Sequence, residues 1–265
     1  MAHEKEMSAE QTYFGLNLAE LQKRGIFALL GIDSALDTAA QKIAFIHTLQ
    51  RYINDKLIDQ GVLLLHSEST FIDFDVKIAA GTTVHQNNII SGKTIIGRDC
   101  TLFPGNVISD CTLGACIVVR ASTLDGASFG DGTTVGPNAY VRPGTRVGQH
   151  CRIGDFVELK NAVIGDDTKV SHLTYVGDAE LGKHVNLGCG VVFVNYNGKE
   201  KRKTTVGDNA FIGCNCNLIA PVSVGKGAYI AAGATVTKDL PDDAFCIARS
   251  RETVYEGRAT KYLKK

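Results

Sequence analysis

The chain has 265 residues, 44% of them hydrophobic, with 28 basic and 28 acidic residues. This length and apolar content suffice for one or two folded domains with a sizeable core. A formal net charge of zero gives no general electrostatic reason to expect nucleic acid or an anionic membrane as a partner.

The first residues are polar and charged, without the apolar run of a signal peptide. No apolar stretch approaches the roughly 18 residues that a membrane span requires. We therefore expect a cytoplasmic protein with no membrane span.

Residues 1–70 do not repeat, and we expect a partly helical N-terminal region there. Within it, residues 37–58 are predicted to form a helix, with Asp33 or Ser34 as the residue that caps its start. The apolar face of this helix would consist of Ile46, Leu49, Ile53 and Leu57.

Residues 71–240 are dominated by a six-residue period. A large aliphatic or aromatic residue recurs at every sixth position, with one-residue slips between the strict runs. The position after the aliphatic residue is often Gly, and the fourth position after the aliphatic residue is usually small. The inward positions are Ile78, Val84, Ile90, Ile96, Leu102 and Ile108, then Val135, Val141, Val147, Ile153 and Leu159, then Ile164, Val170 and Val176, then Leu181, Leu187 and Phe193, and finally Val206, Ile212, Leu218, Val224, Ile230 and Val236.

This period is neither the 3.6 of a helix nor the alternation of a long strand. Each hexapeptide would form a short strand and a turn, with the aliphatic residue inward and the Gly in a turn that a Cβ would crowd. Three units make one coil, and successive coils pair as parallel strands. We therefore predict an all-β solenoid, a parallel β-helix of hexapeptide repeats that follows a short helical N-terminal region.

Two segments depart from the repeat near the end of the chain. Residues 195–205 interrupt it with four basic residues and should project as a basic loop. Residues 241–265 should form a C-terminal arm with a basic tail.

The eight cysteines show no paired zinc-ribbon spacing, and most are expected to be free thiols in the core. Cys189 and Cys214 each follow an inward aliphatic residue by two positions, so they should share one face. A metal or redox pair is an alternative reading of these two thiols.

Polar residues that the repeat does not require are concentrated between positions 142 and 203. They include the segments RPGT, DFVELKN, SHLTYVGDAELG and NYNGKEKRKTTVGDNAFIG. In order and spacing these segments resemble the acetyltransferase domain of the bifunctional GlmU family of hexapeptide-repeat transferases. The resemblance implies a left-handed coil, a homotrimer, and acetyl transfer from acetyl-CoA to the amine of a sugar phosphate such as glucosamine-1-phosphate.

The resemblance also implies a role for individual residues. His172 matches the general base, and Glu158 matches the acidic residue that orients its imidazole. The positions implied to bind the acceptor sugar phosphate are Arg142, Lys160, Tyr175, Asn186 and Lys201. The positions implied to contact acetyl-CoA are Cys189, Asn195, Tyr196, Cys214, Ala232 and Arg249. No metal is required for this chemistry.

The chain departs from the family in two ways. Cys189 and Cys214 stand where the family usually has Ala and Ser. Only about 70 residues precede the coil, without the Gly-rich nucleotide loop of the family's uridyltransferase domain, so no uridyltransferase activity is expected.

Three other functions compete with this interpretation. A γ-class carbonic anhydrase would need His150, His172 and His184 to meet on one metal, but their offsets within the repeat differ. A non-catalytic coil, such as a scaffold or a subunit of a larger assembly, would have no reason to keep the polar set together, whereas a degenerate paralogue that binds sugar nucleotide without turnover could keep it. Acetyl transfer to a different amino sugar or sugar nucleotide would share the mechanism.

Overall fold

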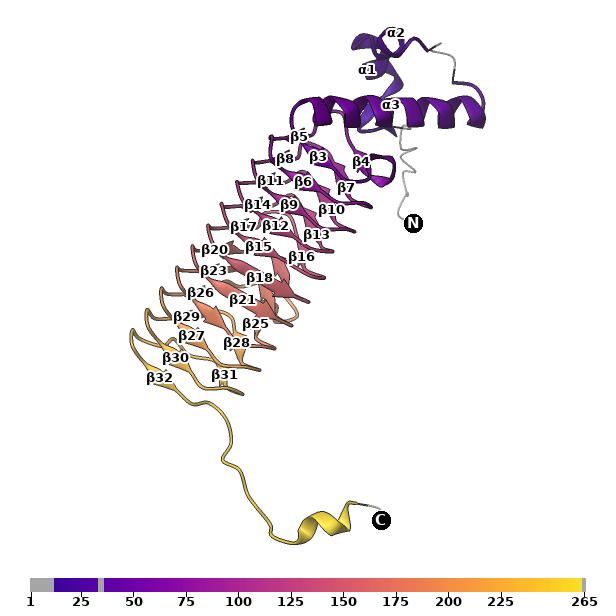
Figure 1. Cartoon of the computed structure of the whole chain (residues 1–265). Coiled ribbons are helices and arrows are strands. Elements are labelled where there is room, and N and C mark those ends of the chain that lie inside the picture. The colour runs from indigo at the N-terminus through magenta and orange to yellow at the C-terminus, as the bar shows by residue number, and fades with distance from the viewer. Residues whose placement is uncertain (1–11, 33–35, 264–265) are drawn as a thin grey trace, which may run out of the picture.

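The structure is a computed structural model that describes residues 12–32 and 36–263. Its main body is a coil of short parallel strands, which stack into three long sheets (Figure 1). The predicted parallel β-helix of hexapeptide repeats is therefore confirmed.

Short helices precede the coil. An antiparallel pair, β1 (Thr12–Tyr13) and β2 (Leu16–Asn17), leads into α1 (Leu18–Lys23) and α2 (Ile26–Leu30), and then α3 (Ala39–Asp59) lies across the end of the coil (Figure 1).

The predicted helix over residues 37–58 corresponds to α3, and three of its four predicted inward residues, Leu49, Ile53 and Leu57, are buried. The fourth, Ile46, is partly buried against the core. The predicted caps Asp33 and Ser34 lie outside the described residues. Thr38 caps the helix instead, in a reciprocal pair of hydrogen bonds with Gln41.

The coil has three faces, each a parallel sheet. The first sheet contains β4 (Phe71–Ile72), β7 (Ile89–Ser91), β10 (Val107–Ser109), β13 (Thr123–Asp125), β16 (Tyr140–Val141), β19 (Glu158–Lys160), β22 (Tyr175–Gly177), β25 (Val192–Val194), β28 (Asn217–Ile219) and β31 (Thr235–Val236). The second contains β5 (Lys77–Ile78), β8 (Ile95–Ile96), β11 (Thr112–Leu113), β14 (Ser128–Phe129), β17 (Arg146–Val147), β20 (Val163–Ile164), β23 (Ala179–Leu181), β26 (Thr204–Val206) and β29 (Val222–Val224). The third contains β3 (Leu63–Leu64), β6 (Thr83–Val84), β9 (Thr101–Leu102), β12 (Val118–Val119), β15 (Thr134–Val135), β18 (Arg152–Asp155), β21 (Lys169–His172), β24 (Asn186–Leu187), β27 (Phe211–Ile212), β30 (Tyr229–Ile230) and β32 (Phe245–Cys246).

The core is the stack of aliphatic side chains inside the coil. All of the inward positions predicted from the period are buried. Pairing is in register from coil to coil, as in Ile90 opposite Ile108 and Ile153 opposite Val170. Burying one such side chain contributes roughly 1.5–3 kcal/mol, so the ladder is the main source of stability. Four cysteines, Cys100, Cys111, Cys151 and Cys216, are buried fillers of this core.

The turns differ in one respect from the prediction. The Gly that follows the aliphatic residue is needed because the next coil approaches closely; a Cβ on Gly154 would lie 1.9 Å from the carbonyl oxygen of Ser171. The left-handed backbone conformation falls two positions later, at residues such as Asp99, His150 and Asp167, whose φ angles are 58°, 54° and 59°.

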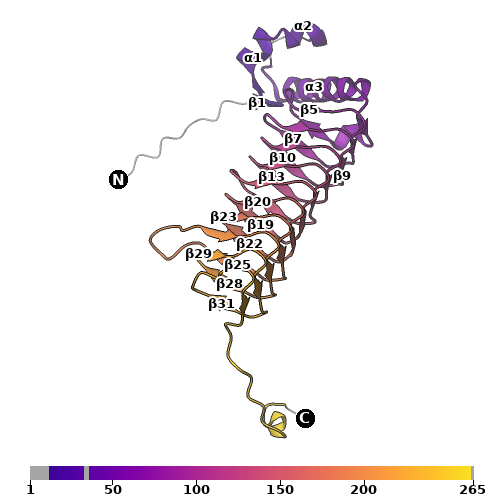
Figure 2. The ribbon, with the colours of Figure 1, turned by 90° about the vertical axis from the view of Figure 1, so that its left-hand side faces the viewer.

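Two segments leave the coil. The loop between β25 and β26 projects from its side (Figure 2), as predicted for the basic residues 195–205. After β32 the chain extends away from the coil and ends in the short 3₁₀ helix η2 (Arg258–Lys261), while a second such turn, η1 (Ser67–Ser69), lies near α3 (Figure 1).

Candidate active site

The register of the third sheet places a carboxylate beside His172. Strand β18 pairs with β21 so that Asp155 lies opposite His172, one coil away. The imidazole Nδ1 is 2.5 Å from the Asp155 Oδ1, and the backbone N–H of Leu173 donates to the Asp155 carbonyl at 2.9 Å. The His172 side chain is 50% exposed, so its ring is open to solvent while one nitrogen is held.

Glu158, which the sequence analysis predicts to orient the imidazole, has a different partner in the structure. It lies in β19 of the first sheet, whereas His172 lies in the third. Its Oε1 accepts a hydrogen bond from the Arg142 Nη1 at 3.0 Å. The acidic partner of His172 in this chain is therefore Asp155, which the sequence analysis did not single out. The sequence feature that could have identified Asp155 is its spacing of 17 residues from His172, which is the length of one coil at this point.

A second polar cluster surrounds Asp178. Its carboxylate accepts from the Asn195 amide at 2.5 Å and from the Asn161 amide at 2.8 Å, and the Lys160 ammonium lies 3.4 Å away. Burial by itself would raise the pKa of Asp178, but these hydrogen bonds and the Lys160 charge outweigh it, and the pKa is lowered. Asp178 therefore joins Lys160 of the coil to Asn195 at the base of the basic loop as a carboxylate.

Three predicted cations lie near one another. The Lys160 and Lys201 side chains are close enough that the contact raises the pKa of Lys160 and lowers that of Lys201. The charge of Arg142 contributes to lowering the Lys201 pKa. The Asn195 amide also reaches the Tyr175 hydroxyl at 3.5 Å. Of the predicted acceptor-binding residues, Arg142, Lys160, Tyr175 and Lys201 are thus gathered around one region, whereas Asn186 lies on the third sheet, opposite Lys169.

Two of the other basic residues of the loop form ion pairs within the chain. Arg202 forms an ion pair with Glu200, and Lys203 forms one with Glu180. A cavity of about 260 Å³ lies between this loop and strands β20 and β23. The Tyr196 hydroxyl donates to the Gly198 carbonyl at 2.7 Å, and its ring is 55% exposed at the loop surface.

The predicted acetyl-CoA positions continue the line of turns that contains His172. Backbone hydrogen bonds join each turn to the one before it, from Gly190 to His172, from Asn215 to Cys189 and from Gly233 to Cys214. The order along this edge is therefore Asp155, His172, Cys189, Cys214 and then Ala232. Arg249 also reaches this edge, because its Cδ lies 3.5 Å from the Cβ position of Gly233.

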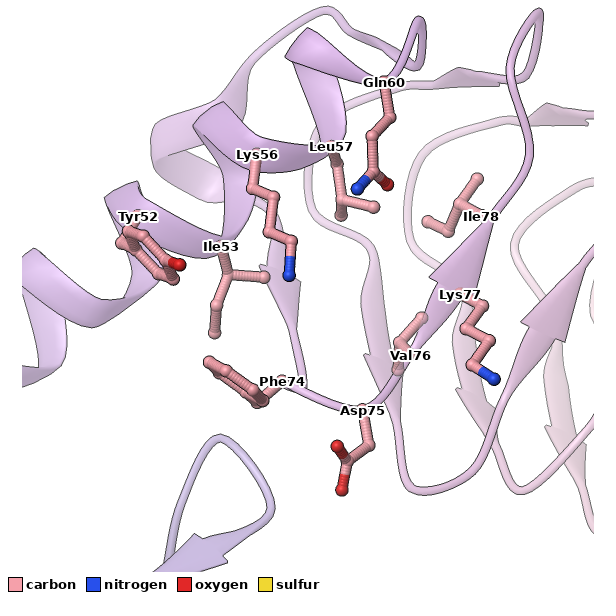
Figure 3. Close-up of a pocket in the computed structure, with 10 residues that line it drawn as sticks. All are labelled: Tyr52, Ile53, Lys56, Leu57, Gln60, Phe74, Asp75, Val76, Lys77 and Ile78. Atoms are coloured by element: carbon pink, nitrogen blue, oxygen red, sulfur yellow. The ribbon is translucent and has the colours of Figure 1, made fainter. Parts of the chain in front are cut away.

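A hollow near the N-terminus is separate from these residues. A cavity of about 480 Å³ lies below the end of α3 (Figure 3), between Ile53 and Leu57 of the helix and Phe74 and Ile78 of the coil. Arg24 covers the Phe74 ring and is paired with Asp75. None of the predicted site residues lines this cavity.

The described residues contain no group of three or more His, Cys, Asp or Glu side chains placed to hold a metal ion. His172 contacts Asp155, and His184 lies 3.8 Å from Asp167 in a different turn. No helix in the described part of the chain is long and apolar enough to cross a membrane.

Comparison with known proteins shows what the chain is similar to. The family model described as bacterial transferase hexapeptide (six repeats) matches residues 126–161 and 203–238. The chain is 48% identical over 204 residues to the bifunctional protein GlmU of Listeria monocytogenes, covering 77% of this chain and 45% of that protein. It is 46% identical over 229 residues to the GlmU of Clostridium botulinum, covering 86% and 49%.

The chain therefore spans about half the length of the curated relatives that it matches. Among solved structures, the UDP-N-acetylglucosamine acyltransferase of Francisella novicida is similar with a TM-score of 0.46 and 19% identity, covering 67% of this chain and 63% of that one.

Proposed function

This chain is a hexapeptide-repeat relative of the bifunctional GlmU proteins, and on that premise we propose that it is an acetyltransferase. The donor is acetyl-CoA, the acceptor is the amine of glucosamine-1-phosphate, and the product is N-acetylglucosamine-1-phosphate. No metal takes part in the transfer. The observation that carries this proposal is the half-exposed His172 imidazole, held at Nδ1 on the same edge of the coil as Cys189 and Cys214.

The proposed mechanism is direct transfer with His172 as general base. The amine nitrogen attacks the thioester carbonyl carbon, and its proton passes to the free Nε2 of His172. The C–S bond then breaks, and CoA leaves as a thiolate that takes up a proton. A positioned base of this kind contributes about 10²- to 10⁴-fold to the rate.

The cations have the role of holding the acceptor's phosphate. Arg142 supplies a planar fork of donors, while Lys160 and Lys201 supply two ammonium groups. Since the contact with Lys160 lowers the pKa of Lys201, a phosphate dianion beside both groups would favour the protonated form of Lys201. Acceptor binding should therefore depend on all three.

The C-terminal arm supports the homotrimer that belongs to this proposal. Four of its apolar side chains are strongly exposed in the single chain: Val254, Tyr255, Tyr262 and Leu263. Large apolar residues gathered on an extended segment are suited to packing on another copy of the protein. In the trimer, this arm would reach a neighbouring coil.

The test is release of free CoA thiol from acetyl-CoA, with glucosamine-1-phosphate as acceptor, on wild type, His172→Asn and His184→Asn. His184 is a matched control because it also has an aspartate 17 residues earlier but lies in another turn. We expect turnover by wild type and His184→Asn, and a loss of about 10²- to 10⁴-fold in kcat for His172→Asn.

The outcomes separate the candidate functions. Turnover that survives in His172→Asn would overturn the role of His172 as base. A folded trimer that acetylates a different amino sugar or sugar nucleotide would change only the acceptor. Absence of turnover with every amino sugar offered would favour a binding protein.

A further inference from the structure

In the turn that carries His172, the imidazole is held by a carboxylate at short range. Asp155 ends β18 and His172 ends β21, and the two residues lie opposite each other in the sheet. Their side chains meet at 2.5 Å between Oδ1 and Nδ1. Another aspartate–histidine pair two hexapeptides later, Asp167 and His184, has the same spacing of 17 residues but a separation of 3.8 Å.

The contact determines which ring nitrogen can accept a proton. The hydrogen bond from His172 is the main cause of the lowered pKa of Asp155, so this carboxyl is ionised near neutral pH. An ionised carboxylate can only accept, and the Nδ1 beside it must therefore carry the hydrogen. The lone pair of the neutral ring is then on Nε2, which is the nitrogen that remains open to a substrate.

Few other charges lie in the turns around this pair. Arg152 begins the same strand as Asp155, and its charge contributes to lowering the Asp155 pKa. Lys169 begins the strand of His172, and on the other side the next turn carries the thiol of Cys189. Within these neighbouring turns, Asp155 is the only acidic group that contacts the imidazole.

The backbone around the pair is also unusual. The residues that directly follow Asp155 and His172 are Phe156 and Leu173, with φ angles of 53° and 45°. Their side chains are 58% and 57% exposed. A bulky residue in the left-handed region costs of order 1–3 kcal/mol, and such strain gathers at functional sites. The next turns of the same edge have Gly190 and Asn215 at this position, which adopt it more easily.

We propose that Asp155 is the positioning residue for His172, fixing the Nδ1–H tautomer and the ring orientation so that Nε2 faces the reacting amine. This inference rests on the proposed acetyl transfer for its kinetic consequence, but its structural consequence can be measured separately. It gives Glu158 a different task, which is to hold Arg142.

The experiment compares Asp155→Ala, Asp155→Asn and the matched control Asp167→Asn, each with and without His172→Asn. We expect Asp155→Ala to lower kcat by about 10- to 100-fold while the KM for acetyl-CoA changes by less than about twofold. Asp155→Asn should retain more activity than Asp155→Ala, because its amide oxygen can still accept from Nδ1. Asp167→Asn should leave kcat unchanged, and Asp155→Ala should add no further loss to His172→Asn.

A second measurement does not depend on turnover. In protein with ¹⁵N-labelled histidine, assigned by comparison with His172→Asn, the ring nitrogens of His172 should report the Nδ1–H tautomer in wild type and a mixture of tautomers in Asp155→Ala.

The two measurements separate the failures of the two proposals. If wild type has no turnover but the tautomer changes in Asp155→Ala, the proposed function fails and the positioning role stands. Wild-type kcat in Asp155→Ala, or an unchanged tautomer in that variant, would overturn the positioning role even in an active acetyltransferase.

Discussion

The coils before and after Gly136 have the same interior and different exteriors. Ile108 in the first set and Leu159 in the second are both completely buried. On the outside, the earlier coils expose aliphatic side chains such as Ile89 and Ile95, which are 47% and 46% exposed. The later coils carry the Asp155–His172 pair and the cluster around Asp178. One repeated core thus supports two surfaces, and only the later one carries the proposed general base.

The turns show the same difference. Among the earlier coils, the left-handed positions hold mostly small or polar residues, such as Asn87 and Asp99. In the later coils two of these positions hold Phe156 and Leu173. Because the local preference of such residues opposes that conformation, the strain is tolerated only where the surrounding coil enforces it.

The largest expected effect comes from removing the same core volume in each set. Ile108→Ala and Leu159→Ala should each lower the free energy of unfolding by about 2–5 kcal/mol. Leu159 lies between Glu158 and Lys160, so its loss should also displace those side chains and lower kcat/KM, whereas Ile108→Ala should retain wild-type kcat/KM. Chemical denaturation and acetyl-transfer assays below the unfolding transition would measure the two effects. Equal loss of activity in both variants would contradict the separation of the two surfaces.

The interior of the coil could be predicted from sequence because its rule is local. Whether a residue such as Val84 or Ile230 points inward depends only on its place in the hexapeptide, and both are buried. The short helices α1 and α2 could not be predicted individually, because they are too short to show a helical period of apolar residues.

The site could be predicted less completely because side-chain partners depend on the register between coils. The region and the cations were predicted, and the structure brings Lys160 and Lys201 together. The partner of His172 was not, because a one-residue slip in the repeat decides that Asp155, and not Gly154, lies opposite it. Asp178 was likewise not assigned a role, since its three partners come from separate segments.

A smaller effect is expected from Asp178→Ala. The substitution leaves Lys160, Asn161 and Asn195 without their shared acceptor, which should cost about 2–3 kcal/mol of unfolding free energy. Because Lys160 would lose its position, the KM for the acceptor should rise roughly tenfold. Asp131→Ala is the control among the earlier coils, where the carboxylate accepts only from the Ala115 N–H among its described hydrogen bonds. Asp131→Ala should lose stability with no change in the KM for the acceptor. A raised KM in this control would show that the KM increase in Asp178→Ala comes from general destabilisation of the coil.

Exchanging the residues in the left-handed turns should change stability by about 1 kcal/mol in opposite directions. Leu173→Asn should raise the denaturation midpoint, because Asn adopts the 45° φ at lower cost. Asn87→Leu should lower the midpoint, since it places a bulky residue at a φ of 59°. Leu173→Asn should nevertheless lower kcat, because the strained turn adjoins His172. A stabilised variant with full activity would show that the strain has no part in function.

The smallest expected effect is the pH dependence of the ion pair near α1. The hydrogen bond from Arg24 lowers the pKa of Asp75, so the pair contributes stability above the unfolded Asp pKa of about 3.9 and loses it as the pH falls through the lower folded pKa. The two side chains are 36% and 51% exposed, so screening should limit the contribution to below about 1 kcal/mol.

Asp178 has a lowered pKa too, but its side chain is only 15% exposed. Denaturation midpoints of wild type, Asp75→Asn and Asp178→Asn between pH 6 and 3 should therefore converge on acidification. Added salt should remove the small Asp75 difference at pH 6 and leave most of the Asp178 difference, because a partly buried carboxylate is screened less. Equal salt sensitivity at both sites would mean that the cluster around Asp178 is as open to solvent as the Arg24–Asp75 ion pair.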